Sequence, residues 1–309
     1  MKILYFTDPH IKGKSPVHRT DNFYDSIMAK VAEVFKIAYE ENCAAVLCGG
    51  DMFDSPTVSL RVADDLVDLI EGEYGNVDLH TVVGNHDMLN CNWSVSDATV
   101  IAHLIRMDKI KLLDKRYQLD KKLHIDGYNY AYDIEDQLRK GLLMRELNPE
   151  SFNIAVVHAM IVANDNPFKC INLEQIPCNY DMVLCSHSHV PFGIKTFGKT
   201  TYVSPGALAR LTIEEKDCKR TPQCAIIDTE TREVKLVPLT SAKPYEEVFD
   251  LSKIAEQKEN AKKLDLFVSA LKSAKIQSLS VATVLEEVCK ASNVDDETKD
   301  LILRKIYAN

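Results

Sequence analysis

Residues 79–87 read LHTVVGNHD, a short stretch of strand-forming residues that a glycine stops and three adjacent polar residues follow. A stretch of this length, ending in two valines, is typical of a β-strand, and Gly84 marks its end. Asn85, His86 and Asp87 offer a carboxamide, an imidazole and a carboxylate, and a loop rarely needs all three for folding alone. The stretch therefore predicts a buried strand that presents reactive groups at its carboxyl end.

The same arrangement recurs at four other apolar runs, at residues 3–6, 44–48, 154–157 and 182–185. The polar residues that follow these runs are Asp8, His10, Asp51, His158, His187 and His189. Helical spacing of apolar residues at 23–41 and 60–70 separates the first three strands, which predicts a parallel sheet built from strand–helix–strand crossovers. Loops at the carboxyl ends of parallel strands share one crevice, so we expect these distant residues to converge.

The second half of the chain contains more strand, and its C-terminus changes character. Apolar runs at 201–203, 225–227 and 234–237 predict three more strands, the last two joined as a hairpin. From Glu246 onward there is neither glycine nor proline, and apolar residues recur at helical spacing among many charges. We predict an α/β main domain at residues 1–240 and a small helical appendage at residues 241–309.

The composition indicates a globular protein that is acidic overall. Hydrophobic residues make up 46% of the 309 residues, which excludes general disorder. Lysine and arginine total 37 against 46 aspartate and glutamate, for a net charge of -9. Proteins that bind nucleic acid unaided usually carry a basic surface. A polynucleotide substrate would therefore require a local basic groove, bound metal cations or a basic partner.

The nine cysteines include no C-x-x-C pair, and several lie in apolar runs, as expected of reduced thiols in a core. No run is long enough for a signal peptide or a membrane span. We therefore expect a soluble, cytoplasmic protein without a membrane partner.

The residue types at the five strand ends favour metal ions as their shared ligand. Carboxylate, imidazole and carboxamide groups without a thiolate suit Mn²⁺, Fe²⁺, Mg²⁺ or Zn²⁺. Seven such residues are too many for one ion and fit two. Two ions roughly 3.5–4 Å apart can clamp the attacking and leaving oxygens of a phosphoryl displacement. The pattern therefore predicts a dinuclear centre.

Taken in order, D-x-H, G-D, G-N-H-D, a histidine after a strand and H-x-H resemble the calcineurin-like metallophosphoesterase superfamily, over residues 1 to about 240. The resemblance implies a four-layered αββα sandwich with two metal ions at the strand ends. It implies that one ion is bound by Asp8, His10, Asp51 and His189, and the other by Asp51, Asn85, His158 and His187. It further implies that His86 is the general acid and that Asp87 orients His86 or a ligand.

Several tracts narrow the resemblance to the SbcD-type nuclease branch, which includes double-strand-break repair nucleases and the small subunit of a phage recombination nuclease. These tracts are GDMFDSP at 50–56, HSHVP at 187–191 and SPG at 204–206. One departure is Asp54, because archaeal and eukaryotic members carry a histidine three residues after the bridging aspartate. The branch implies a Mn²⁺-dependent DNA exonuclease, with or without endonuclease activity, in DNA repair, recombination or replication. It also implies an SbcC-type ATPase partner, which would account for the acidic net charge.

Two other functions are compatible with parts of this pattern. A small-molecule phosphodiesterase or phosphatase would share the metal centre but needs an enclosed pocket and no ATPase. A non-catalytic scaffold would lack ligands or the acid, whereas all seven ligand-type residues and His86 are present. For the C-terminal helices, docking of a partner, capping of the main domain and a homodimer contact remain open alternatives.

Overall fold

The computed structural model describes residues 1–75, 77–114, 116–163, 170–253, 255–256 and 259. The chain divides into two compact units, Met1–Phe249 and Asp250–Asn309. Most of the predicted C-terminal helical appendage lies outside the described residues. Residues 241–249 belong to the first unit, since Val248 and Phe249 are buried and the Thr20 N–H donates to the Val248 carbonyl oxygen at 2.9 Å.

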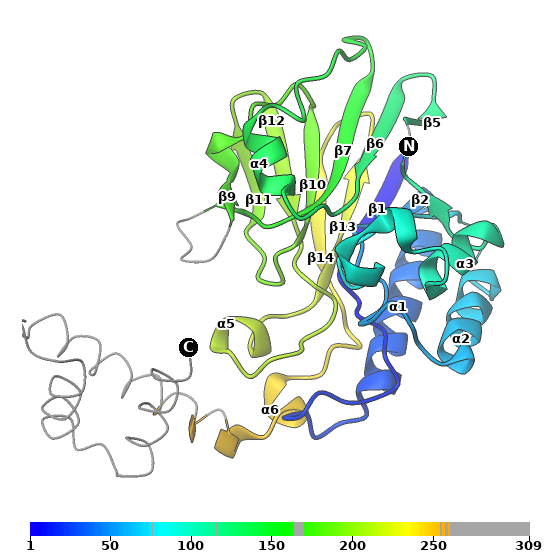
Figure 1. Ribbon diagram of the computed structural model, residues 1–309, viewed down its shortest axis with the longest axis vertical. Helices are drawn as coiled ribbons and strands as arrows, with labels where there is room; N and C mark the ends of the chain where they lie inside the picture. The colour runs from blue at the N-terminus through cyan, green and yellow to red at the C-terminus, as the bar shows by residue number, and fades with distance from the viewer. Residues whose placement is uncertain (76, 115, 164–169, 254, 257–258, 260–309) are drawn as a thin grey trace, which may run out of the picture. The chain divides into compact units, whose positions relative to one another are not determined.

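Within the described residues, two six-stranded sheets form the centre of the first unit (Figure 1). The strands of one sheet are β1 (Lys2–Phe6), β2 (Cys43–Cys48), β3 (Leu79–Thr81), β4 (Lys111–Leu112), β13 (Gln223–Asp228) and β14 (Val234–Pro238). Those of the other are β5 (Tyr117–Asp120), β6 (Leu123–Tyr128), β7 (Phe152–Ala159), β10 (Met182–His187), β11 (Gly193–Phe197) and β12 (Thr200–Ser204). Their orders are β14-β13-β1-β2-β3-β4 and β11-β12-β10-β7-β6-β5. A separate parallel pair joins β8 (Ile161–Val162) to β9 (Ile171–Asn172).

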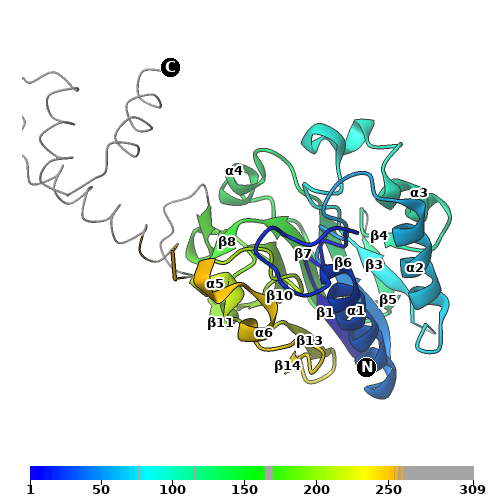
Figure 2. The ribbon, with the colours of Figure 1, turned by 90° about the horizontal axis from the view of Figure 1, so that it is seen from below.

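Helices cover the outer faces of both sheets (Figures 1 and 2). The helices are α1 (Phe23–Glu40), α2 (Leu60–Glu71), α3 (Val100–Arg106), α4 (Ile134–Arg139), α5 (Glu215–Cys218) and α6 (Tyr245–Val248). Short 3₁₀ turns lie at Leu89–Cys91, Trp93–Val95 and Leu173–Gln175. Apolar residues of α1, α2 and α3 pack on the first sheet, and those of α4 pack on the second. Among the described helices, none is both long and apolar enough to cross a bilayer.

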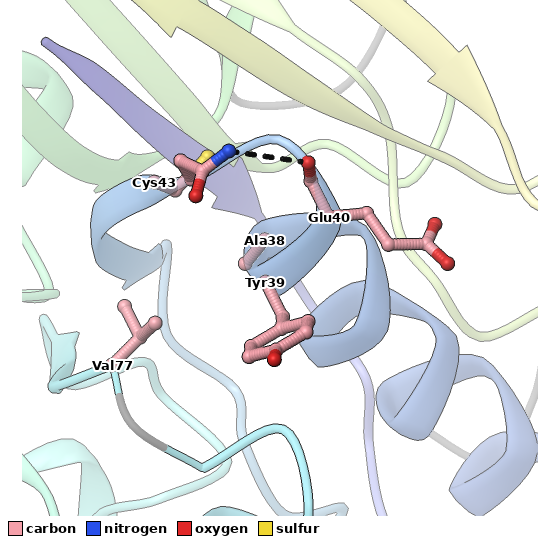
Figure 3. A pocket seen from close by; sticks show the side chains of 6 residues that line it. Ala38, Tyr39, Glu40, Cys43 and Val77 are labelled. Atoms are coloured by element: carbon pink, nitrogen blue, oxygen red, sulfur yellow. Dashed lines mark hydrogen bonds between the residues drawn. The ribbon is translucent and has the colours of Figure 1, made fainter.

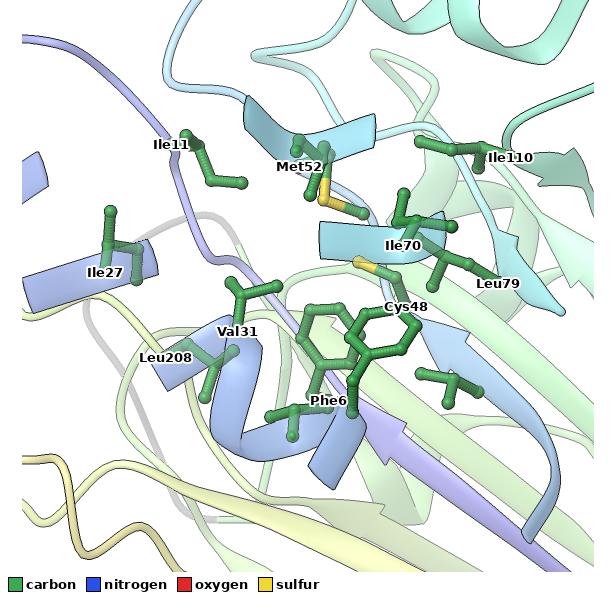
Figure 4. Packing of buried hydrophobic residues seen from close by; sticks show 14 of the residues in the cluster. Phe6, Ile11, Ile27, Val31, Cys48, Met52, Ile70, Leu79, Ile110 and Leu208 are labelled. Carbon is green, nitrogen blue, oxygen red and sulfur yellow. The ribbon is translucent and has the colours of Figure 1, made fainter. Parts of the chain in front are cut away.

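Three buried apolar clusters separate four layers of structure. The first cluster, which includes Phe6 and Val31, lies between the helices and the first sheet (Figure 4). The second, which includes Tyr5 and Leu184, lies between the two sheets, and the third lies around Leu138 of α4 on the far face of the second sheet. The architecture is therefore the predicted αββα sandwich.

Strand periodicity produces this layering. Successive side chains of a strand point to opposite faces, and both faces of each sheet are covered. In β1, Leu4 and Phe6 pack toward the helices, whereas Ile3 and Tyr5 pack toward the second sheet. This two-sided burial explains why the strand is a continuous apolar run rather than an alternating one.

The predicted strand and helix positions of the first half are confirmed, and the hairpin of β13 and β14 is antiparallel as expected. The first sheet is mixed rather than wholly parallel, because β13 returns antiparallel beside β1. The sequence did not predict β6, because the polar residues His124 and Asp126 interrupt its apolar pattern. Asp126 is nonetheless buried, and the Tyr180 hydroxyl donates to its carboxylate at 2.6 Å.

Candidate metal centre

Five strand ends meet at one edge of the two sheets. β1, β2 and β3 run parallel in the first sheet, and β7 and β10 run parallel in the second. His158, the penultimate residue of β7, donates from Nδ1 to the carbonyl oxygen of Gly49, just after β2, at 2.7 Å. The His187 N–H at the end of β10 donates to the Asp8 carboxylate, beyond β1, at 3.2 Å. These contacts bring the carboxyl ends of both sheets together.

Asp8, His10 and His189 form one group of possible metal ligands. One ligand atom from each lies within 4.8 Å of the other two. The Nε2 atoms of His10 and His189 are 3.0 Å apart, and Asp8 Oδ1 lies 4.0 Å from His10 Nε2. The group therefore combines residues that follow β1 with one that follows β10, as the sequence predicted.

Asp51, His158 and His187 form a second group, again with ligand atoms within 4.8 Å of one another. His158 Nε2 lies 3.4 Å from Asp51 Oδ2 and 3.3 Å from the Asn85 side-chain oxygen. Because Gly49 accepts from Nδ1 of His158, Nε2 is the ring nitrogen that remains for a metal ion. Asn85 thus joins this group.

Asp51 lies between the two groups. Its Oδ2 atom is 3.4 Å from Nε2 of His158 in one group and 3.7 Å from Nε2 of His10 in the other. The other oxygen, Oδ1, accepts the backbone N–H of His86 at 2.8 Å, which fixes the carboxylate. This placement is what a carboxylate shared by two ions requires.

Unsatisfied polar atoms test whether the site fits a cation. Asp8 Oδ1 is buried and has no hydrogen-bond partner. Leaving a buried carboxylate oxygen unpaired is costly. A divalent cation beside Asp8 Oδ1 would satisfy it, and the facing Nε2 atoms of His10 and His189 could bind the same ion. The donor set, with oxygen and imidazole nitrogen and no thiolate, therefore fits two such ions.

Backbone strain is concentrated at the same residues. Nine non-glycine residues in the described part of the chain have positive φ, and four of them are Asp8, His10, Asp51 and His187. Such conformations cost of order 1–3 kcal/mol each and persist mainly where surrounding structure holds them, often at functional sites. The strain supports a shared function for these four residues.

Gly50 allows the two sheets to approach at the centre. Its φ is +95°, and a Cβ there would lie 2.7 Å from His158 Nδ1 and 2.9 Å from the Gly84 nitrogen. Any side chain would displace either the histidine or the following loop. The Gly-Gly-Asp tract after β2 is thus required by close packing as well as by turn geometry.

Comparison with known proteins establishes the family. Residues 1–232 match the calcineurin-like phosphoesterase superfamily domain. This chain is a calcineurin-like phosphoesterase. The match covers every strand of both sheets except β14 and includes all seven candidate ligands. The phosphoesterase accordingly belongs to a group of hydrolases that act on phosphoesters with a dinuclear metal centre.

Individual relatives of this phosphoesterase are distant. The probable exonuclease subunit 1 of Escherichia phage T5 is 23% identical over 245 residues, which span 77% of this chain and 69% of the phage protein. Two solved structures are also similar. A dimetal phosphatase from Danio rerio has 10% identity and a TM-score of 0.49, covering 77% of this chain and 96% of its own. An archaeal phosphodiesterase has 16% identity and a TM-score of 0.42, covering 77% and 100%.

Buried charged groups at the candidate metal centre shift one another's pKa values. Burial lowers the pKa of His158, but the Asp51 carboxylate outweighs it and raises the pKa to about 9. Burial would raise the pKa of Asp51, yet His158 and His10 hold it far below its usual range. Burial, together with the nearby His158, lowers the pKa of His187 to about 4. The buried carboxylates therefore stabilise positive charge here, as they would for metal cations.

His86 lies beside the two groups. Its ring centroid is 4.7 Å from that of His10, and its Nδ1 lies 2.8 Å from the Asp54 carbonyl oxygen. Since a carbonyl only accepts, Nδ1 carries the hydrogen in that contact, and Nε2 is left to exchange a proton. Together, His10, Asp54 and His86 also form a third grouping of possible ligand atoms.

Asp87 does not contact the His86 ring. It is buried, and its carboxylate accepts N–H groups of Met52 at 3.3 Å, Phe53 at 3.1 Å and Gly84 at 3.0 Å. Burial and the nearby Asp51 raise the pKa of Asp87 to about 7, against the effect of these N–H donors. Asp87 therefore ties the loop after β2 to the loop after β3, and both of these loops carry candidate ligands.

Sequence reasoning missed several residues at the centre. Ser186 lies 3.3 Å from His158 Nδ1, and Tyr130 packs its ring 5.6 Å from that of His187. Asp54 Oδ1 lies 3.5 Å from His10 Nδ1, while Lys12 contacts its other oxygen at 2.9 Å. Ser186 and Tyr130 belong to no motif with a metal-ligand spacing, whereas Asp54 lies in the GDMFDSP tract, three residues after Asp51, and could have been found there.

A surface hollow lies away from these groups. It has a volume of about 500 Å³ and is lined by Ala38, Tyr39, Glu40, Asn42, Cys43 and Val77 (Figure 3). Cys43 begins β2, whereas Asp51 follows the end of that strand. The hollow is therefore at the amino end of the sheet and is separate from the candidate metal centre.

Proposed function

We propose that this phosphoesterase is a metal-dependent DNA nuclease, an exonuclease with or without endonuclease activity, that acts in DNA repair, recombination or replication. The observation that carries the proposal is the convergence of seven ligand-type residues and His86 at one edge of the sheets. The similarity to a phage exonuclease subunit along 77% of the chain supports DNA as the substrate.

In this proposal, Asp8, His10, Asp51 and His189 bind one ion, and Asp51, Asn85, His158 and His187 bind the other. Asp51 is the shared ligand, consistent with its place between the two groups. Mn²⁺ is the metal that we propose, since it accepts a mixture of oxygen and imidazole ligands. The two ions would supply Lewis-acid activation of water and of the phosphoryl oxygen.

The residues of the chain contribute positioning and proton transfer. His86 donates a proton from Nε2 to the leaving oxygen, while the Asp54 carbonyl oxygen holds its Nδ1–H. Asp87 keeps the loops after β2 and β3 in register through three backbone N–H groups. The proposed catalytic residue is His86, and Asp87 acts through the loops that it joins.

The acidic composition favours a partner that contributes DNA affinity. A net charge of -9 opposes binding of a polyanion, except where metal ions or lysines compensate locally. We propose an SbcC-type ATPase as that partner, and the phage relative is itself called a subunit. Copurification of an ATPase with the chain from its native cells would support this, and its absence from a stable purified complex would contradict it.

Hydrolysis of two substrates tests the proposed function. The full chain is incubated with Mn²⁺ or with EDTA, using end-labelled linear DNA and the simple diester bis(p-nitrophenyl) phosphate. We expect Mn²⁺-dependent degradation of the DNA, abolished by EDTA and by His86→Ala. Activity confined to the simple diester would instead indicate a small-molecule phosphodiesterase.

A further inference from the structure

The loop after β12 passes behind two of the proposed metal ligands. We refer to residues 205–212 as the strap. Three consecutive N–H groups of the strap donate to carbonyl oxygens in ligand-bearing loops: Ala207 to His189 at 3.1 Å, Leu208 to Thr7 at 2.9 Å and Ala209 to Asp8 at 3.3 Å. The strap therefore holds the backbone at Asp8 and at His189, which come from different sheets.

Gly206 allows the strap to come this close. Its φ is +77°, and a Cβ at this position would lie only 2.8 Å from the His189 carbonyl oxygen. The backbone of the strap can therefore approach the H-x-H loop only because residue 206 has no side chain. Its exact position then depends on the contacts that hold the rest of the strap.

Arg220 binds the carbonyl oxygens of two of the same strap residues. Its Nη1 donates to the carbonyl oxygen of Ala207 and its Nη2 to that of Ala209. Its Nε donates to Asp217 Oδ1 at 2.9 Å, and the side chains of both residues are only 6% exposed. The guanidinium therefore fixes Ala207 and Ala209, whose N–H groups donate to the carbonyl oxygens of His189 and Asp8.

Asp217 fixes the far end of the strap. Its Oδ2 accepts the N–H of Leu211 at 3.0 Å and the N–H and hydroxyl of Thr212 at 2.9 and 3.1 Å. The Asp217 carboxylate thus orients Arg220 and also fixes the C-terminal end of the strap. All of the polar groups in this connection are buried or partly buried, so its geometry is strongly determined.

We propose that Arg220, braced by Asp217, is a positioning residue that sets the spacing between Asp8 and His189 at the metal centre. The inference rests on the proposed function only in taking these two residues as metal ligands, and not in taking DNA as the substrate. The guanidinium is suited to this because its planar fork binds two carbonyls and a carboxylate at fixed angles. A lysine would keep the charge but could not make the three contacts together.

A pair of matched substitutions tests the proposal. Arg220→Lys is compared with Arg116→Lys, because Arg116 also donates two N–H groups to the carboxylate of a buried aspartate, Asp126, but lies outside the strap. Mn²⁺ affinity is measured by calorimetry, and the coupling of bound Mn²⁺ by electron paramagnetic resonance, at a temperature where circular dichroism shows each protein folded. We expect Arg220→Lys to weaken Mn²⁺ binding by roughly 10-fold or more and to replace the coupled-pair signal with that of an isolated ion. Arg116→Lys should bind like the wild type, within about twofold.

The alternative results are distinct. Wild-type affinity and coupling in folded Arg220→Lys would overturn the proposal, as would equal losses in both variants. If Arg220→Lys does not fold, Asp217→Asn decides: weaker binding supports the proposal and unchanged binding overturns it. A wild-type chain that binds no Mn²⁺ would overturn the metal centre itself. A chain that binds two ions but does not cut DNA would leave the role of Arg220 intact.

Discussion

His86, like His158, has one ring nitrogen held by a backbone carbonyl, but it belongs to neither of the two groups proposed to bind the ions, so its Nε2 is left to exchange a proton. Loss of a general acid typically lowers a rate by 10²–10⁴-fold. We expect His86→Ala to lower turnover by about that factor while two Mn²⁺ ions stay bound, as measured by metal analysis of the dialysed protein. His103→Ala, at an exposed residue of α3, is the matched control. Loss of metal in His86→Ala would mean that His86 is a ligand, as its grouping with His10 and Asp54 allows.

Lys30 of α1 is buried, and its ammonium group donates to the backbone and hydroxyl oxygens of Ser26. Burial lowers its pKa to about 7 from 10.5, with help from the cations Arg19 and Arg210. Between pH 7 and 10.5 the unfolded chain binds a proton at Lys30 that the folded chain does not, so the free energy of unfolding rises with pH over this range. Burial of Lys30 therefore costs the folded protein most below pH 7 and least above pH 10.5.

We therefore expect Lys30→Met to raise the free energy of unfolding at pH 6–7 by a few kcal/mol, since one pKa unit corresponds to about 1.4 kcal/mol. This gain should shrink as the pH rises toward 10. Urea unfolding of the variant and the wild type at pH 6–10 measures the difference. Lys36→Met, at an exposed position of the same helix, should show no such pH dependence. Parallel curves for Lys30→Met and wild type would contradict the prediction.

At the scale of elements, the turn after β2 couples strand packing to the metal centre. A Cβ at Gly50 would meet His158 Nδ1 at 2.7 Å, and φ is +95°. We expect Gly50→Ala to lose at least about 1–2 kcal/mol of stability from the backbone alone and also to weaken Mn²⁺ binding, because His158 must move.

Gly198→Ala is the control for that substitution, because Gly198 also has positive φ, +60°, but a Cβ there meets nothing within 4 Å. It should reduce thermal stability without a change in Mn²⁺ affinity. Equal Mn²⁺ affinity in the two variants would show that the approach of Gly50 to His158 has no part in the metal centre.

At the scale of the whole molecule, the first compact unit contains both sheets and every candidate ligand. We expect a chain that ends at Phe249 to fold, to bind Mn²⁺ and to hydrolyse bis(p-nitrophenyl) phosphate. Circular dichroism, metal analysis and the diester assay measure these properties. An unfolded or metal-free product would mean that residues 250–309 are needed to complete the centre. The full chain is the control in each measurement.

Short stretches of sequence were enough to predict part of the fold. The GNHD loop, the GGD turn and the H-x-H pair are each short, and each follows an apolar run whose burial on both faces requires a covered parallel strand. The element positions and a parallel sheet were predictable for that reason, whereas the αββα sandwich was implied by the family resemblance of the motifs. β6 was not predictable, because His124 and Asp126 interrupt its apolar pattern, and Asp126 is buried against a partner distant in sequence, Tyr180.

The sequence alone determined which chemical groups stand at the ends of five strands, because residue type and strand periodicity are local properties. Only the tertiary structure decided that Asp51 lies between two ligand groups, that Asp87 joins two loops, and that Arg220 holds the strap behind Asp8 and His189. Those relations depend on contacts between segments up to about two hundred residues apart, which form only once neighbouring strands pair and the two sheets pack together.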